Sequence, residues 1–151
     1  MYKYTDSGLD NIYLENGYHK KETPYGTAVS IEDIDGLHRA IGRWLVNIPK
    51  PLSGGEFRFL RHELDLSQKK LGRLMGMSEQ SIARWEKKTN RPIDPIADRL
   101  IRIIYIEFAD KNGPVRELIE KLAEMDQRDQ ADGHFVERDG RWRIAETCLA
   151  A

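Results

Sequence analysis

The polar side chains with the most informative types and spacing lie between residues 78 and 88. Gln80 and Arg84 stand four residues apart, so on a helix they share one face. An amide and a guanidinium group can each bond two atoms of one base edge in the DNA major groove. Ser81, a small neighbour, permits close approach to that groove. The spacing therefore favours recognition of double-stranded DNA by an exposed helix face.

The sequence offers little to other kinds of chemistry. Its single cysteine, Cys148, excludes an intramolecular disulfide and a CxxC zinc site. Ser53-Gly54-Gly55 is glycine-rich but lacks the lysine of a phosphate-binding loop. The histidines show no ligand spacing such as HxxxH; they are His19, His38, His62 and His134. Because no nucleophile stands beside a base, we expect no enzyme activity, no metal and no cofactor.

Charge is unevenly distributed along the chain. The 151 residues hold 24 basic and 25 acidic side chains, a net charge of -1. Residues 51–91 carry nine basic against five acidic side chains, a net charge of +4, whereas residues 92–151 carry -4. A basic middle segment indicates an anionic partner. The alternative is an ordinary solvated helical surface.

Two short helices joined by a tight turn must position the polar face. Ser67 is expected to cap the first helix, which turns Leu71, Leu74 and Met75 inward. Gly76 suits a left-handed turn position. Ser78 caps the second helix, whose inward residues are Ile82 and Trp85, and Gly72 lets the helices approach closely. This arrangement is a helix-turn-helix.

The N-terminal part is predicted to be rich in β-structure. We expect strands near residues 11–15, 18–23 and 27–31, with Asn16-Gly17 as a hairpin signal. Apolar residues from Leu37 to Ile48 then follow helical spacing, with Asp33 or Asp35 as the cap. Residues 47–55 hold two prolines and two glycines after that helix, which predicts a linker and a domain boundary.

Further helices are expected on both sides of the two motif helices. Ser53 and Glu56 have capping-box spacing at the start of a helix. Residues 95–109 carry two apolar stripes. The first stripe is Ile96, Leu100, Ile103, Ile104 and Phe108, and the second is Ala97, Ile101 and Tyr105. One stripe is enough to pack on a core, so the second predicts a subunit interface and a homodimer. The alternative is a helix buried on two sides within one chain.

The C-terminal part is expected to be a helix followed by a hairpin. Pro114 opens an amphipathic helix that runs to Met125, and Asp139-Gly140 marks a hairpin turn. Residues 126–133 are polar and predicted to be mobile, and Cys148 is predicted to be inert. The fold class is therefore α+β, with a small α+β domain over 1–50, a helix-turn-helix domain over 51–112, and a C-terminal helix and hairpin over 113–151.

Residues 57–92 resemble the helix-turn-helix of the phage-repressor (Xre/Cro/C1-type, lambda-repressor-like) family. The matching residues are Leu60-Arg61, Leu66-Ser67-Gln68, Leu71, Gly76-Met77-Ser78, Ile82, Trp85-Glu86 and Pro92. The resemblance implies that Gln68 meets a phosphate at a helix N-terminus, that Gln80 and Arg84 read bases, and that Ser78, Glu79 and Ser81 lie near the groove. Arg61 and Glu86 are implied to form an internal ion pair. The phosphate-contact candidates are Lys69, Lys87, Lys88 and Arg91.

The order of parts is similar to that of the MqsA/YgiT-type antitoxin regulators. In that family a small β-rich domain precedes the helix-turn-helix, and this chain has Asp-Gly-Leu-His at residues 35–38 before its own. The family's two zinc-binding CxxC pairs are absent here, so the metal site does not carry over. We expect a cytoplasmic, dimeric repressor on a palindromic operator, without a membrane segment. The alternative is an antitoxin that neutralises a partner toxin and represses its own operon.

Overall fold

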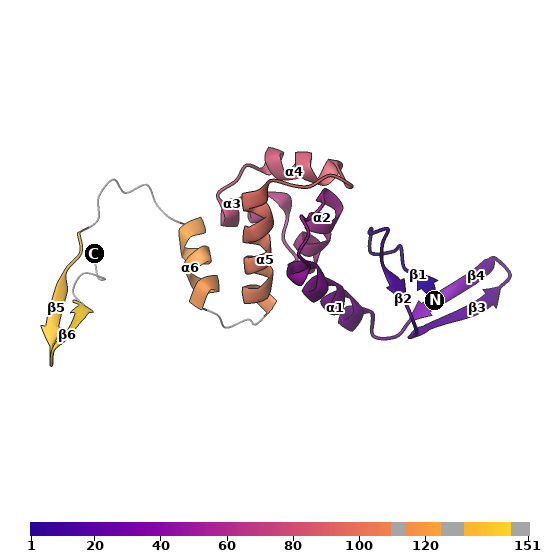
Figure 1. The fold of residues 1–151 in the computed structure, drawn as a ribbon, viewed down its shortest axis with the longest axis horizontal. Helices are drawn as coiled ribbons and strands as arrows, with labels where there is room; N and C mark the ends of the chain where they lie inside the picture. Colours follow the sequence, from indigo (N-terminus) through magenta and orange to yellow (C-terminus); the bar gives the residue numbers. More distant parts are fainter. Residues whose placement is uncertain (110–113, 125–131, 146–151) are drawn as a thin grey trace.

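The computed structural model describes residues 1–109, 114–124 and 132–145, which form six strands and six helices (Figure 1). The strands are β1 (Tyr2–Lys3), β2 (Tyr13–Leu14), β3 (Tyr18–Thr23), β4 (Gly26–Ile31), β5 (Phe135–Arg138) and β6 (Arg141–Ile144). The helices are α1 (Ile34–Asn47), α2 (Gly54–Glu63), α3 (Gln68–Met75), α4 (Glu79–Lys87), α5 (Pro95–Ala109) and α6 (Pro114–Ala123). The predicted α+β class is confirmed. No helix among the described residues is long and apolar enough to cross a membrane.

Polar caps set where the helices begin. Asp33 caps α1 by accepting from the Gly36 amide. Ser53 and Glu56 form a complete capping box at the start of α2. Ser67 and Ser78 cap α3 and α4 by accepting from the Lys70 and Ser81 amides. Each cap satisfies an amide that would otherwise lack a partner within its helix.

The N-terminal strands pair differently from the prediction. The expected hairpin at Asn16-Gly17 is wrong, because β2 pairs with β1 and β3 pairs with β4 across residues 24–25. Leu14 of β2 is buried in the core that the N-terminal part shares with the helices, whereas residues 18–31 contribute only half-buried side chains to it, those of Tyr18 and Ile31. The pairing of β2 with β1 thus goes together with burial of Leu14 in the shared core, which local turn chemistry does not predict.

One cluster of buried side chains runs from the N-terminal strands to α5. It contains Tyr4, Leu45, Phe57, Leu60 and Ile101, among others. α1 packs on both α2 and α5. A boundary at residue 50 therefore falls between two helices that share one core.

Residues 47–52, the first part of the segment expected to be a linker, are held against α5. The Arg102 guanidinium donates to the carbonyls of Val46, Ile48 and Lys50. The Asp98 carboxylate accepts from the Leu52 amide at 2.7 Å and from Arg102 at 2.6 Å. These contacts satisfy one of the last carbonyls of α1, that of Val46, and fix the path of the connection into α2.

The second apolar stripe of α5 does not form a subunit interface. Ala97, Ile101 and Tyr105 are buried within the single chain. A Cβ placed on Gly42 would lie 2.1 Å from the Tyr105 hydroxyl, so α1 and α5 meet closely through this glycine. The interface expected on this stripe is therefore wrong. The apolar side chains that α5 leaves exposed are Ile96, Ile103 and Ile106.

The C-terminal elements are a helix and a hairpin. α6 packs on α3 and α5. β5 and β6 form an antiparallel pair whose turn, Asp139-Gly140, has positive φ at both residues, as predicted for this hairpin. The predictions for residues 126–131 and for Cys148 lie outside the described residues.

Candidate nucleic-acid interface

The connection between α3 and α4 is a tight left-handed turn. Gly76 has φ 69° and ψ 30°, a conformation that strains residues with a Cβ. The Met77 amide donates to the Gly72 carbonyl at 2.8 Å. A Cβ on Gly72 would lie 2.6 Å from the Met77 carbonyl oxygen, so only glycine permits this crossing. The two glycines therefore set the angle at which α4 leaves α3.

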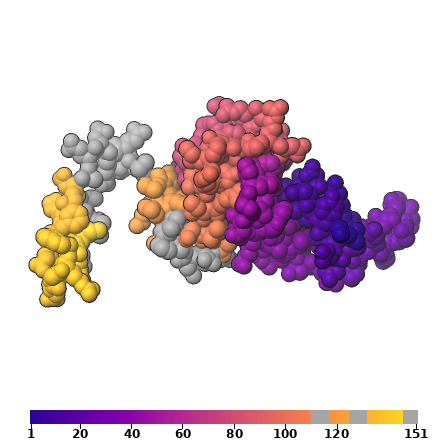
Figure 2. All heavy atoms as spheres, in the orientation of Figure 1, coloured from indigo at the N-terminus to yellow at the C-terminus, as the bar shows by residue number. Residues whose placement is uncertain are grey.

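Helix α4 has a buried face and an exposed face. Ile82 is fully buried, Glu86 is 6% exposed, and the Trp85 ring lies edge-on to Phe57 with centroids 6.0 Å apart. The residues of α4 on the exposed side are Glu79, Gln80, Arg84 and Lys87, with Ser81 half-buried. In Figure 2 the pink to salmon atoms of α4 and the following loop form the upper edge of the helical part. Gln80 and Arg84 are thus available to a partner.

A buried ion pair joins α2 to α4. Arg61 donates from Nε and Nη2 to the two Glu86 oxygens at 2.7 and 2.8 Å. Its Nη1 donates to the Leu66 carbonyl at 2.9 Å. Gln68 donates to Glu86 Oε1 at 3.2 Å. The structure thus brings together the two residues that resemblance paired, and their network fixes α2, α3 and α4 relative to one another.

The remaining candidates occupy different places around this network. Gln68 stands at the first position of α3 with one amide hydrogen directed to Glu86, which leaves its second hydrogen for a phosphate. The Ser78 hydroxyl caps α4 by accepting from the Ser81 amide, and it also donates to the Ser81 hydroxyl. Both hydrogen bonds engage it within the chain. The exposed cations at the end of α4 and in the loop after it are Lys87, Lys88 and Arg91.

The N-terminus of α2 holds the loop that follows α4, a contact that the sequence did not predict. The amides of Gly54 and Gly55 donate to the Arg91 and Thr89 carbonyls, each at 3.0 Å. A Cβ on Gly54 would lie 2.0 Å from the Trp85 carbonyl oxygen. The sequence signal for this contact is the pair Gly54-Gly55, which by composition alone predicts a linker.

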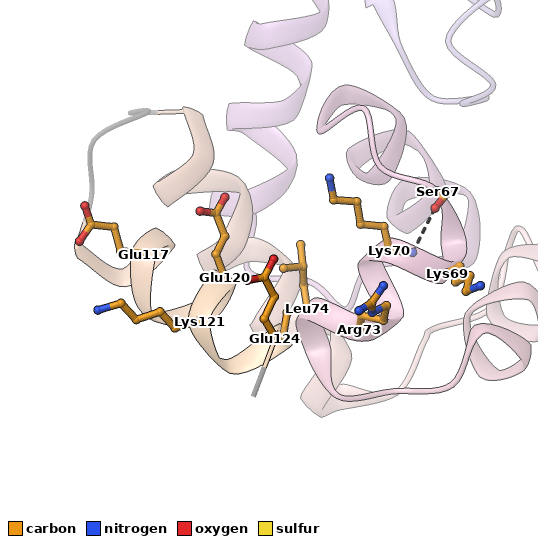
Figure 3. A pocket seen from close by; sticks show the side chains of 10 residues that line it. Ser67, Lys69, Lys70, Arg73, Leu74, Glu117, Glu120, Lys121 and Glu124 are labelled. Carbon is orange, nitrogen blue, oxygen red and sulfur yellow. Dashed lines mark hydrogen bonds between the residues drawn. The ribbon is translucent and has the colours of Figure 1, made fainter. Parts of the chain in front are cut away.

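The outer face of α3 looks across a cavity of about 710 Å³ toward α6 (Figure 3). Lys69, Lys70 and Arg73 line it from α3. The α6 residues that line it include Glu117, Glu120, Lys121 and Glu124. The three carboxylates lower the positive potential of this side of α3, which weakens its attraction for phosphates. Among the described residues, no cluster of His, Cys, Asp and Glu is arranged to hold a metal ion.

Comparison with protein families identifies the central segment. Residues 57–104 match the family model described as helix-turn-helix, so this segment is a helix-turn-helix domain of the Xre/Cro/C1 type. The chain is accordingly a DNA-binding transcription regulator. No curated protein and no solved structure matches the chain. The resemblance to MqsA/YgiT-type regulators stays a hypothesis.

Proposed function

We propose that the chain is a dimeric repressor whose α4 helices read the two halves of a palindromic operator. The observation that carries this proposal is the exposure of Gln80 and Arg84 on α4, opposite the buried Ile82 and Glu86. The Arg61–Glu86 pair holds α4 rigid, so both reading side chains keep a fixed position. Bidentate contacts to adenine from Gln80 and to guanine from Arg84 then select sequence.

The surrounding polar residues set affinity and register. Gln68 and Lys69 at the start of α3, and Lys87, Lys88 and Arg91 beyond α4, are proposed to contact phosphates, which are alike in every sequence. Glu79, Ser78 and Ser81 begin α4 and are proposed to lie at the edge of the groove.

A second copy is proposed to pack on the exposed face of α5. Ile96 and Ile103 are 68% and 50% exposed, and Ile106 lies three residues further along the same helix. One short recognition helix contacts few base pairs, whereas a dimer reads two half-sites about one helical turn (~34 Å) apart. Burial of this apolar face in a symmetric contact supplies the association.

The proposal for reading residues is tested by titration of variants. A target duplex is first selected from random sequences with the full chain, and a scrambled duplex serves for comparison. Arg84→Ala is expected to reduce discrimination at one base pair of each half-site by about 1–3 kcal/mol. Lys88→Ala is expected to weaken both duplexes equally and to lower the salt slope by about one ion. Equal losses on both duplexes for Arg84→Ala would show that Arg84 holds phosphate instead.

The dimer is tested by sedimentation of the full chain. Ile103→Asp is expected to yield monomers that bind a single half-site, because a carboxylate cannot be buried unpaired in the interface. Ile34→Asp is the matched control, since Ile34 is similarly exposed (45%) on α1. A wild-type chain that stays monomeric both free and on DNA contradicts the proposal. Repression itself is tested with a reporter fused to the upstream region of the gene.

The second candidate function is that of an antitoxin. The observation that favours it is the exposed β3–β4 hairpin, whose Tyr25 is fully exposed and lies outside the proposed DNA surface. Such a surface fits a protein partner. A toxin-sized reading frame beside the gene, whose product co-purifies with the chain and is silenced by it, would support this candidate. Co-purification lost in Tyr25→Ala with DNA binding retained would locate the contact.

A further inference from the structure

The C-terminal ribbon, β5–β6, separates its side chains onto two unlike faces. Its register pairs Val136 with Arg143 and Arg138 with Arg141, so these four side chains share one face. The opposite face carries Phe135, Glu137, Trp142 and Ile144. Three guanidinium groups therefore gather on one side of a hairpin only four residues long in each strand.

This arginine face lacks a partner within the described part of the chain. Arg138, Arg141 and Arg143 are all exposed, and no ion pair among the described residues includes them. Glu137 points from the other face, and its Oε1 accepts from the Gly140 amide at 2.8 Å. Asp139 occupies the turn.

The placement of like charges indicates what the face binds. Arg138 and Arg141 stand directly opposite each other, an arrangement that destabilises an antiparallel pair. An anionic partner removes this repulsion. The planar guanidinium forms paired hydrogen bonds with phosphate oxygens, and a two-stranded ribbon is narrow enough to lie along or within the major groove.

We infer that the arginine face of β5–β6 is a second DNA-contacting surface, which grips the phosphate backbone beside the half-site read by α4. This inference rests on the DNA-binding role of the chain. Because α4 fills the groove at the half-site, the ribbon contacts flanking DNA. Its contribution is to affinity and not to base choice, since phosphates carry no sequence information.

The test compares two duplexes that share the selected central sequence. One spans only the two half-sites (about 20 base pairs) and the other adds flanks on both sides (about 40 base pairs in all). The wild-type chain is expected to bind the longer duplex about tenfold more tightly. Arg138→Gln/Arg141→Gln/Arg143→Gln is expected to lose this gain and to lower the salt slope by about 1 to 3 on the longer duplex.

A matched variant controls for loss of charge alone. Lys3→Gln/Lys20→Gln/Lys21→Gln removes three exposed cations from β1 and β3 and is expected to keep the gain from the flanks. The single variant Arg141→Gln removes one of the two opposed charges and is expected to lose part of the gain. Arg141→Gln replaces the triple variant in this test if the triple variant changes the folding of the hairpin.

The possible outcomes separate this inference from the proposed function. If the ribbon variant binds both duplexes as the wild type does, the arginine face has another partner, such as an acidic protein, and the inference is overturned. Equal losses in the arginine and lysine variants also overturn it. If the wild-type chain shows no preference for the selected duplex over a scrambled one, the proposed operator recognition fails, whatever the ribbon does.

Discussion

The helix-turn-helix part and the N-terminal β part are held in place by different kinds of contact. In the helical part, the buried acids Glu86 and Asp98 are paired with the buried Arg61 and the half-buried Arg102. In the N-terminal part, the buried side chains are Tyr4, Leu9, Ile12 and Leu14, and the Tyr4 hydroxyl is hydrogen-bonded to His38. A buried charge is costly without its partner, so it specifies one arrangement. Apolar contacts and a single hydrogen bond specify less.

This comparison predicts the largest loss for a break in the buried network. Glu86→Ala leaves Arg61 buried without its carboxylate and is expected to cost about 3–5 kcal/mol of unfolding free energy. Urea unfolding followed by helical circular dichroism measures it. Glu79→Ala, an exposed acid in the first turn of the same helix, is expected to cost about 0.3–1 kcal/mol. Equal losses in the two variants would show that burial does not distinguish these acids.

Loss of the hydrogen bond that joins the N-terminal part to α1 is expected to reduce the unfolding free energy less. Tyr4→Phe removes the hydroxyl that lies 2.7 Å from His38 Nε2 and is expected to cost about 1 kcal/mol. DNA affinity should be unchanged, because the bond joins the N-terminal part to α1 and not to α4. Tyr2→Phe is the control, since the Tyr2 hydroxyl has no hydrogen bond within the described residues. A drop in DNA affinity for Tyr4→Phe would show that the two parts are coupled.

The acidic face of α6 offers a comparison of electrostatic effects. Glu117→Gln/Glu120→Gln/Glu124→Gln removes three charges that line the same cavity as Lys69, Lys70 and Arg73. The variant is expected to raise DNA affinity about two- to fivefold at low salt. Neutralising Asp10, Glu15 and Glu22 removes three exposed acids from the N-terminal part and should raise affinity less. Equal gains from both variants would mean that only net charge matters.

The smallest expected effect concerns pH. Partial burial, with Arg61 and Arg58 nearby, lowers the pKa of His62 below its usual value. The unfolded chain then binds the proton more readily, so stability falls as pH drops through about 6.5 toward the folded-state pKa. His62→Gln is expected to reduce the difference between unfolding midpoints at pH 7.5 and 5.5. An unchanged difference would assign the acid sensitivity to other groups.

The helix-turn-helix can be predicted from the sequence because its signals are local. Ser67, Ser78 and Gly76 act within one turn of chain, through caps and a left-handed residue, and the structure has these features at those positions. The hairpin at Asp139-Gly140 is local in the same way. The roles of Gln80, Arg84, Lys87 and Lys88 in DNA binding stay predictions.

Errors arose where distant segments decide the outcome. The partner of β2 depended on where Leu14 is buried, and Asn16-Gly17 carries no information about that burial. Residues 47–52 have the composition of a linker, yet Arg102 and Asp98, some fifty residues away, bind their backbone. In each case the deciding contact lies far along the chain from the residues it orders.

The sequence by itself determined the caps, the tight turn and the helical spacing of α3 and α4, because these follow from hydrogen bonds and dihedral preferences of neighbouring residues. Only the tertiary structure decided which apolar residues of α5 are buried. Ala97, Ile101 and Tyr105 of one stripe and Ile104 of the other are buried, whereas Ile96 and Ile103 remain exposed. Both stripes have helical period, so the pattern alone ranks them equally, and only the positions of the packed neighbours distinguish them.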